Sequence, residues 1–304
     1  MIVIYRKWKR GVLRMNYSSK LAKAYNIPTV INETPLTKGK TASTYLIHTD
    51  SSRKFILKSM DTKEQAFFEY KLNKHIRDKN LNIVSEILTT TNGEPFIQRG
   101  DSLFQLQTYV VSENEKAPLQ KVLHVYSMLQ ETLKDFDYDS NRNNRFKLDE
   151  LWLNFKGNLY ENFQSIYEEI YASIEDLTVL DNSQINWIHG DLGAWNILYT
   201  AERNICFIDF SEARKGPQYF DLVAIFASYL PRDLKLFDTY TQKFLTTYGV
   251  AVNVKEFYQT LELWYVKGIL SLLKFDMHLI KEQIFYFYNI IKCIKSLKTH
   301  NLCN

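Results

Sequence analysis

Residues 188–196 read Ile-His-Gly-Asp-Leu-Gly-Ala-Trp-Asn, and residues 206–210 read Cys-Phe-Ile-Asp-Phe; these two stretches decide the fold. β-Branched and aromatic residues flank the polar positions, which predicts a strand, a loop and a hairpin-like return to a second strand. The two strands would bring Asp191 and Asp209 to one end of a small sheet. The sequence therefore predicts a common phosphate site at that end, and Asn196 lies between the two Asp residues in the sequence.

The order and spacing of these three residues fit phosphoryl transfer. In that chemistry an Asp accepts the proton of the attacking hydroxyl, while an Asn five residues later and an Asp on the next strand hold Mg²⁺ against the ATP phosphates. Asp191 is therefore the candidate catalytic residue, and Asn196 and Asp209 are the candidate metal ligands. An Asp at a strand end can instead cap a turn, so the assignment depends on the three elements occurring together.

The same block, followed by Gly-Pro-Gln-Tyr-Phe-Asp-Leu at 216–222, resembles the aminoglycoside phosphotransferase and choline kinase group. That group has Gly or a small residue in place of the Arg of a protein kinase's His-Arg-Asp, and a variable residue after Asp-Phe. Gly190 and Ser211 occupy these two positions. The resemblance implies an α+β, two-lobed protein-kinase-like fold, with an N-terminal antiparallel sheet lobe and a larger, mainly helical C-terminal lobe. It also implies ATP and Mg²⁺ as cofactors, and loop-bracing roles for His189 and Asp221.

A fold of this kind needs a loop that covers the nucleotide phosphates and a strand lysine that contacts them. Residues 38–43 read Lys-Gly-Lys-Thr-Ala-Ser and precede a predicted strand at 44–49, so Gly39 and Ser43 are candidates for the phosphate-covering loop. The next predicted strand covers 54–58 and ends on Lys58. Lys58 is the candidate contact to the phosphates, with a solvated strand end as the alternative.

Helix signals follow, beginning at 61–64 and continuing with apolar residues at helical spacing. Glu69 lies on this helix and is the candidate partner that orients Lys58, with Glu64 as a competitor and a solvated helix face as the alternative. A predicted strand pair at 95–98 and 103–110 then brackets a turn.

The resemblance places the hinge that holds an adenine ring directly after this strand pair, at 109–112. Tyr109 and Val110 are therefore candidate nucleotide-binding residues. Backbone hydrogen bonds normally hold adenine at a hinge, so side chains there carry little specific information.

The length of 304 residues and the 45% apolar content fit one large or two medium domains with a substantial core. The expected divisions are a basic extension at 1–14, an N-lobe at 15–110 and a C-lobe at 111–304. The extension could be a basic arm, although we favour the hypothesis that the native protein starts at Met15. N-terminal sequencing of the natively expressed protein would reject that hypothesis if Met1 were retained.

The three cysteines form no Cys-x-x-Cys pair, and no apolar stretch approaches the roughly 20 residues that span a bilayer. We expect a soluble, cytoplasmic protein with reduced thiols, no nucleic-acid partner and no membrane span. Oligomeric state has no signature in the sequence. Arg214 and Lys215 follow the second stretch, and solvent exposure is expected of both, with a phosphate contact as the alternative.

Residues 131–181 are expected to be helical and are acidic, with twelve Asp or Glu against five Lys or Arg. A negative acceptor cleft would attract a cationic acceptor. Solvated helix faces explain the same acids and are the favoured interpretation. The lysines of the C-terminal helices oppose such a field and leave a neutral acceptor open.

The predicted function is transfer of the ATP γ-phosphoryl group to a hydroxyl of a small molecule, such as an aminoglycoside, choline or an amino alcohol. Asp191 would accept the proton, and Lys58, set by Glu69, would contact the phosphates. Two alternatives are a kinase-like structural protein of the spore-coat type and a kinase that acts on proteins. ATP rather than GTP is an implication of the resemblance.

Overall fold

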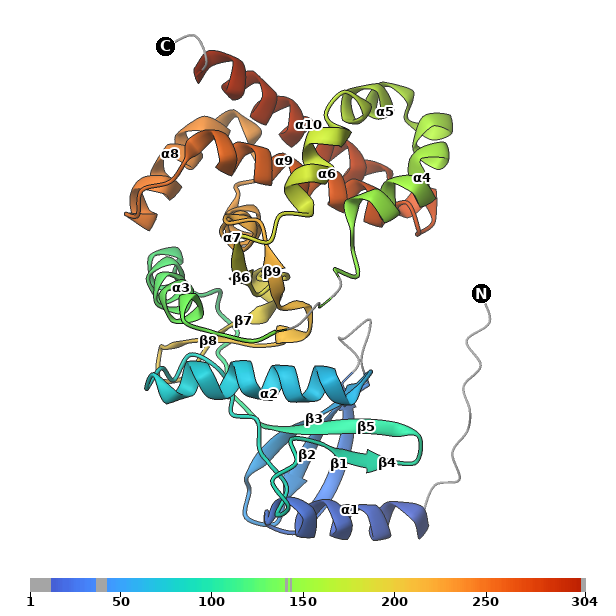
Figure 1. Cartoon of the computed structure of the whole chain (residues 1–304), viewed down its shortest axis with the longest axis vertical. Helices are drawn as coiled ribbons and strands as arrows, with labels where there is room; N and C mark the ends of the chain where they lie inside the picture. The colour runs from blue at the N-terminus through green and yellow to red at the C-terminus, as the bar shows by residue number, and fades with distance from the viewer. Residues whose placement is uncertain (1–11, 37–42, 140–141, 143, 302–304) are drawn as a thin grey trace. The chain divides into compact units, whose positions relative to one another are not determined.

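An antiparallel sheet of five strands forms the first part of the chain (Figure 1). The strands are β1 (Val30–Leu36), β2 (Thr44–Thr49), β3 (Lys54–Met60), β4 (Ile97–Arg99) and β5 (Ser102–Thr108). Their order in the sheet is β1-β2-β3-β5-β4. The computed structural model describes residues 12–36, 43–139, 142 and 144–301.

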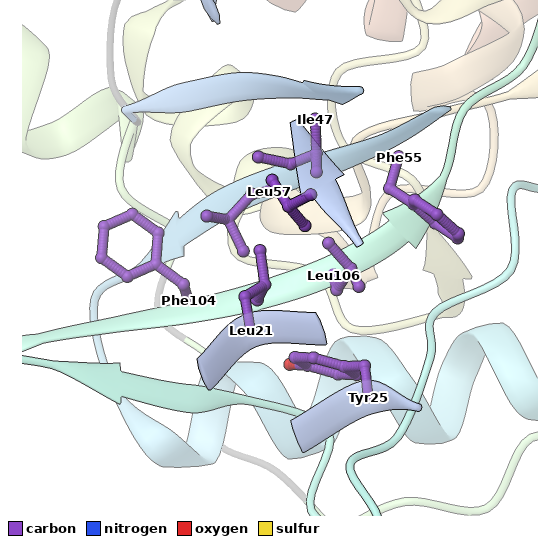
Figure 2. Close-up of a cluster of buried hydrophobic side chains, with 8 residues drawn as sticks. Leu21, Tyr25, Ile47, Phe55, Leu57, Phe104 and Leu106 are labelled. Atoms are coloured by element: carbon purple, nitrogen blue, oxygen red, sulfur yellow. The ribbon is translucent and has the colours of Figure 1, made fainter. Parts of the chain in front are cut away.

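The two faces of this sheet carry different side chains because successive residues of a strand point to opposite faces. Leu57 of β3 pairs with Leu106 of β5, and both belong to an apolar cluster that also contains Leu21 and Tyr25 of α1 (Val12–Tyr25). Figure 2 shows these side chains converging between helix and sheet. This cluster anchors the strands that carry the residues on the other face.

The opposite face carries polar residues and packs against α2 (Lys63–Asp78). Lys58 pairs with Gln105 across the strands, and Gln105 Nε2 donates to the Ala66 carbonyl oxygen of α2 at 3.1 Å. The helix begins where the Thr62 hydroxyl accepts a hydrogen bond from the Gln65 N–H, as an N-cap does. Because side chains alternate between the two faces of a strand, Lys58 lies on the face that packs against α2, the helix that carries Glu69.

The chain divides into two compact units. The smaller unit comprises Met1–Ser112 and Thr200–Glu202, and the larger comprises Glu113–Tyr199 and Arg203–Asn304. The helices of the larger unit are α3 (Leu119–Lys134), α4 (Leu148–Asn162), α5 (Gln164–Tyr171), α6 (Ile174–Asp181), α7 (Phe220–Tyr229), α8 (Phe237–Tyr248), α9 (Val254–Leu272) and α10 (Met277–Asn301), with short 3₁₀ turns at Ala194–Asn196, Phe210–Glu212 and Leu234–Leu236. The five-stranded antiparallel sheet of the smaller unit and the many helices of the larger unit confirm the predicted α+β class.

Two small antiparallel sheets in the larger unit frame the motif residues. One pairs β6 (Asn186–Ile188) with β9 (Arg214–Gly216), and the other pairs β7 (Ile197–Tyr199) with β8 (Ile205–Phe207). The predicted strand, loop and hairpin-like return around residues 188–208 are therefore present.

The core of the larger unit is rich in aromatic side chains. Phe226 of α7 is fully buried and makes edge-on contacts with Phe237, Phe244 and Phe257 from α8 and α9. Burying a side chain of this size contributes about 1.5–3 kcal/mol. Core packing of this kind accounts for much of the 14% aromatic content.

Several elements differ from the sequence prediction. The strand predicted at 54–58 continues to Met60, because Ser59 and Met60 still pair with β5. The segment 135–147, predicted as helix, has no helix among its described residues until α4 begins at Leu148. No sequence pattern indicated β1 or α1. Most of the basic extension, and Gly39, lie outside the described residues, and no described helix has both the length and the apolarity to cross a bilayer.

Candidate active site

The motif residues of the larger unit surround the loop between β6 and β7. His189, Gly190 and Asp191 leave β6, and Asn196 closes the 3₁₀ turn before β7. The Ile208 N–H donates to the Asn196 carbonyl oxygen at 3.1 Å, directly before Asp209. Asn196 and Asp209 therefore lie at the same end of the β7–β8 hairpin.

Asp221, in the first turn of α7, binds the start of this loop. Its Oδ2 accepts the His189 N–H at 2.6 Å and its Oδ1 accepts the Gly190 N–H at 2.9 Å. The carboxylate has no exposed surface, and burial raises its pKa, although His189 and the two amides oppose the rise. Both oxygens are thus occupied by backbone donors of the loop.

The His189 ring lies inside the loop rather than in solvent. Its Nδ1 accepts the Asp191 N–H at 3.3 Å, which places the ring hydrogen on Nε2, 2.9 Å from the Ile208 carbonyl oxygen. One imidazole therefore links the loop to Ile208, the residue between β8 and Asp209. Gly190 adopts φ 83°, and a Cβ there would overlap Arg214 and the Glu212 backbone, so only glycine fits this turn.

The carboxylate of Asp191 has two unequal oxygens. Oδ2 accepts hydrogen bonds from Trp195 Nε1 and from Asn196 Nδ2, both at 3.1 Å. Oδ1 accepts no hydrogen bond from any residue that the structure describes. Burial raises the pKa of Asp191, and the nearby Asp209 and Glu212 carboxylates raise it further, whereas the Trp195 hydrogen bond and His189 lower it. One oxygen is therefore held in place while the other can accept a proton.

The fit to a magnesium ion can be tested on Asn196 and Asp209. Asn196 uses its amide nitrogen to bind Asp191 and is nearly buried, and its Oδ1 accepts no hydrogen bond from the described residues. Mg²⁺ prefers oxygen ligands and usually takes only one or two carboxylates, with phosphates and waters completing its shell. Within the described ranges no group of three or more His, Cys, Asp or Glu could hold a metal. The residues fit an ion held jointly by substrate phosphates, not a site made by protein alone.

In the smaller unit, Lys58 and Glu69 form a buried ion pair. Lys58 Nζ lies 3.2 Å from Glu69 Oε2, and the other carboxylate oxygen accepts a hydrogen bond from Gln65 Nε2 at 3.0 Å. Glu64, the competing partner, is exposed. The contact between Lys58 and Glu69 that the sequence predicts is therefore present.

The remaining candidates of the smaller unit lie at two loops. Ser43 precedes β2, and its N–H donates to Ser59 Oγ at 2.8 Å. Tyr109 and Val110 follow β5, and the Tyr109 N–H donates to the Lys54 carbonyl oxygen at 3.3 Å. No residue within the described part of the chain hydrogen-bonds to the backbone of Val110.

Sequence reasoning missed several residues around the motif. Trp195 lies within the motif and was assigned no role there, although its indole binds Asp191. Arg145 forms an ion pair with Glu212, with Nε donating to Oε1 at 2.8 Å, and Arg142 Nη2 donates to the Ser211 carbonyl oxygen at 2.6 Å. The expectation that Arg214 is exposed was wrong, because its guanidinium is buried against Gly190. No sequence signal connects the Arg142–Arg145 segment with residues nearly seventy positions later.

The acidic region is partly neutralised within the larger unit. Asp181 pairs with Lys267 at 2.6 Å, and Glu169 pairs with Lys295 at 2.6 Å, so lysines of α9 and α10 reach carboxylates of α5 and α6. The balance of charges along 131–181 therefore overstates the negative charge that this region presents.

A family comparison gives this geometry a context. The family model described as APH, phosphotransferase enzyme family, matches residues 32–251, more than two thirds of the chain. The chain belongs to this family. The resemblance drawn from the motifs is confirmed, and the protein is a phosphotransferase. A search of curated proteins returned no match to the sequence.

Solved structures show that this phosphotransferase has the kinase-like fold of the family. An aminoglycoside phosphotransferase from Alicyclobacillus acidocaldarius is 14% identical with a TM-score of 0.63, covering 98% of this chain and 99% of the other. Amicoumacin kinase in complex with AMP-PNP, Ca²⁺ and Ami is 15% identical with a TM-score of 0.69, covering 93% of both chains. Spectinomycin phosphotransferase with ADP and spectinomycin is 15% identical with a TM-score of 0.58, covering 91% and 93%. At these identities the likeness shows the fold alone.

Proposed function

We propose that this phosphotransferase moves the γ-phosphoryl group of ATP to a hydroxyl of a small molecule, with Asp191 as the general base. The observation that carries the proposal is the unequal use of the Asp191 carboxylate. Trp195 and Asn196 occupy Oδ2, and no described residue donates to Oδ1. A general base needs one oxygen within hydrogen-bond reach of the proton it removes.

In the proposed reaction Asp191 Oδ1 accepts the proton of the acceptor hydroxyl. The acceptor oxygen forms a bond to the γ-phosphorus, and the bond from that phosphorus to the β–γ bridging oxygen breaks, releasing ADP. Bound Mg²⁺ would neutralise charge on the phosphates. Asn196 Oδ1 and Asp209 are the proposed protein ligands of the ion, because both lie at the same end of the β7–β8 hairpin.

Each unit has its own part in this proposal. Within residues 15–110, Lys58 contacts the nucleotide phosphates and Glu69 fixes its ammonium group, since the pair is buried and 3.2 Å apart. Gly39 and Ser43 would belong to the phosphate-covering loop, and the backbone at Tyr109 and Val110 would bind adenine. Gly39 lies outside the residues that the structure describes.

Within residues 111–304, His189 and Asp221 hold the loop that carries Asp191. Their support comes from the hydrogen bonds of Asp221 to two loop amides and of the His189 ring to Ile208. This arrangement keeps the general base in one place, and positioning supplies a large share of the rate in phosphoryl transfer.

The proposal also covers the chemical class of the acceptor and the cellular compartment of the reaction. Solved relatives named for aminoglycoside, amicoumacin and spectinomycin kinases support an antibiotic-like or amino-alcohol acceptor. We place the reaction in the cytoplasm, where ATP is supplied. Cys206 and Cys293 are free thiols, which agrees with a reducing compartment.

The test is Mg²⁺-dependent ADP release across a panel of hydroxyl acceptors that includes aminoglycosides, macrolides, choline, homoserine and sugars, with ATP and GTP compared. We expect acceptor-stimulated turnover that Asp191→Asn abolishes. The matched control is Asp238→Asn, the same chemical change at an exposed position in the first turn of α8. Turnover that survived Asp191→Asn would contradict the proposed base, and Mg-ATP binding without turnover of any acceptor would contradict the acceptor class.

A further inference from the structure

Trp195 is a large apolar side chain left in solvent beside the proposed general base. It is 60% exposed, and its indole N–H donates to Asp191 Oδ2 at 3.1 Å. Because most of the indole stays in solvent, it contributes little hydrophobic stabilisation to the folded protein. Exposed aromatic side chains at a reactive group commonly serve in binding, because the ring offers a wide apolar face and the N–H a polar handle.

Gly193 leaves room for the indole ring of Trp195. Gly193 has φ −81° and ψ 171°, a backbone conformation that any residue adopts. A Cβ at this position would nevertheless overlap the six-membered ring of Trp195. The absence of a side chain is therefore required by the indole and not by the backbone.

The hydrogen bond also fixes the orientation of the Asp191 carboxylate. Asn196 Nδ2 donates to the same oxygen at 3.1 Å and to the Asp191 carbonyl oxygen at 2.8 Å. Two donors from neighbouring residues of one 3₁₀ turn converge on Oδ2. Rotation of the carboxylate would break both bonds, so the two donors hold Oδ1 in one position.

We propose that Trp195 has two roles in the phosphotransfer proposed above. Its indole N–H is a positioning group that holds Asp191 in its reactive orientation, and its exposed ring is a surface against which the acceptor rests. Only the width of one carboxylate separates the indole N–H from the oxygen that takes the proton, so an acceptor bound there lies beside the ring. An aromatic face favours an alcohol carried on a saturated ring, whose flat C–H side can stack on it, over an alcohol on a flexible chain. This inference rests on the proposed function.

The kinetic test uses the full chain and separates the two roles. Trp195→Phe keeps a ring and loses the N–H, so we expect kcat to fall about tenfold, the size of one hydrogen bond to a charged group, with the KM for the acceptor nearly unchanged. Trp195→Leu loses both, so the KM for ring alcohols should also rise several-fold while the KM for ATP stays constant. The control is Tyr171→Leu, because Tyr171 is 61% exposed on α5.

Gly193→Ala supplies a second route to the same site. The added methyl group displaces the indole, so we expect losses like those of Trp195→Leu. In a Trp195→Leu background, Gly193→Ala should add almost nothing, since the ring that it would displace is gone. Additive losses would show that the glycine serves the backbone, and would overturn the assigned ring position.

One readout does not depend on turnover. The Nε1–H resonance of Trp195, assigned by its absence in Trp195→Phe, should move when Asp191 is changed to Ala and when a ring alcohol is added. A wild-type chain without turnover would refute the proposed function, whereas an unmoved resonance in Asp191→Ala would refute the positioning role. Wild-type kcat in Trp195→Phe would refute it too. An acceptor KM unaltered in Trp195→Leu, or a resonance that no acceptor in the panel shifts, would refute the contact with the acceptor.

Discussion

Each unit contains a buried lysine–carboxylate pair, and the two pairs share their chemistry but not their surroundings. In the smaller unit Lys58 Nζ lies 3.2 Å from Glu69 Oε2, and in the larger unit Lys267 Nζ lies 2.6 Å from Asp181 Oδ1. All four side chains are at least nine-tenths buried. Burial and pairing alone therefore do not separate a candidate reactive group from a structural one.

The partners of each carboxylate make the difference. Asp181 also accepts the Leu148 N–H at 2.8 Å and lies 3.3 Å from Asn144 Nδ2, so it ties the start of α4 to α6 and α9. Glu69 has its second oxygen bound by Gln65 of its own helix. The Asp181 pair thus joins several elements, while the Glu69 pair fixes one lysine on one strand. We infer that the first serves the fold and the second serves the nucleotide.

The largest effect is expected when the Lys58–Glu69 pair is removed completely. Lys58→Met with Glu69→Leu should lower kcat/KM at least about 100-fold, because loss of one group that stabilises transferring charge typically costs that much. The free energy of unfolding should change little, since apolar residues can replace a buried pair without loss. Steady-state kinetics and urea unfolding measure the two quantities. Activity within threefold of wild type would remove Lys58 from the site.

Lys267→Met is expected to affect stability instead. It leaves the Asp181 carboxylate buried without its ammonium partner, which should lower the free energy of unfolding by about 3–5 kcal/mol. The kcat of the folded fraction should be unchanged. Lys74→Met is the matched control, because Lys74 and Asp78 form an exposed pair at 2.7 Å whose loss should cost less than about 1 kcal/mol. Equal losses in the two variants would show that burial of the Lys267 pair is energetically unimportant.

Adding Asp181→Asn to Lys267→Met should restore more than half of the lost stability. The amide carries no charge, and its oxygen can still accept the Leu148 N–H. Chemical unfolding of the single and double variants gives this recovery directly. A double variant no more stable than Lys267→Met would mean that the lysine acts through packing on Phe220, over whose ring it lies at 5.3 Å.

The remaining effect concerns pH. Burial lowers the pKa of Lys267 from its usual 10.5 to about 8, although Asp181 opposes the shift. Between these two values the folded protein has released this proton while the unfolded chain still binds it, so the free energy of unfolding rises with pH through this window. Below pH 8 both states bind the proton and the slope disappears. Unfolding of wild type and Lys267→Met across the window isolates the effect, and a constant difference between them would refute it.

Local patterns predicted the elements that carry the proposed site. Short apolar and β-branched runs next to loop or turn residues predicted β2 and β3, and the helix signals at 61–64 predicted the helix that brings Glu69 to Lys58. The strand pattern predicted that Asp191 and Asp209 lie at one end of a small sheet, and the two carboxylates are near enough for the charge of Asp209 to act on Asp191. These successes have one cause, because each depends on residues close together in the chain.

The failures involve residues far apart or patterns that tertiary packing overrides. β1 contains Pro35 and polar residues, and it forms because β2 pairs along it. The Lys267–Asp181 pair joins residues 86 positions apart, and no periodicity indicates it. Trp195 was visible in the motif, but only a three-dimensional contact shows that its N–H reaches Asp191.

The hydrogen bonds of Asp221 have one more consequence, for amide exchange with solvent. Loops usually exchange their amide hydrogens early, through small local openings. The N–H groups of His189 and Gly190 are instead bound by a carboxylate with no exposed surface, in the first turn of a helix whose residues 220–226 are all buried. Releasing them requires α7 to leave the core. These two loop amides should therefore exchange as slowly as those of the core helices, so the loop opens only when the larger unit unfolds.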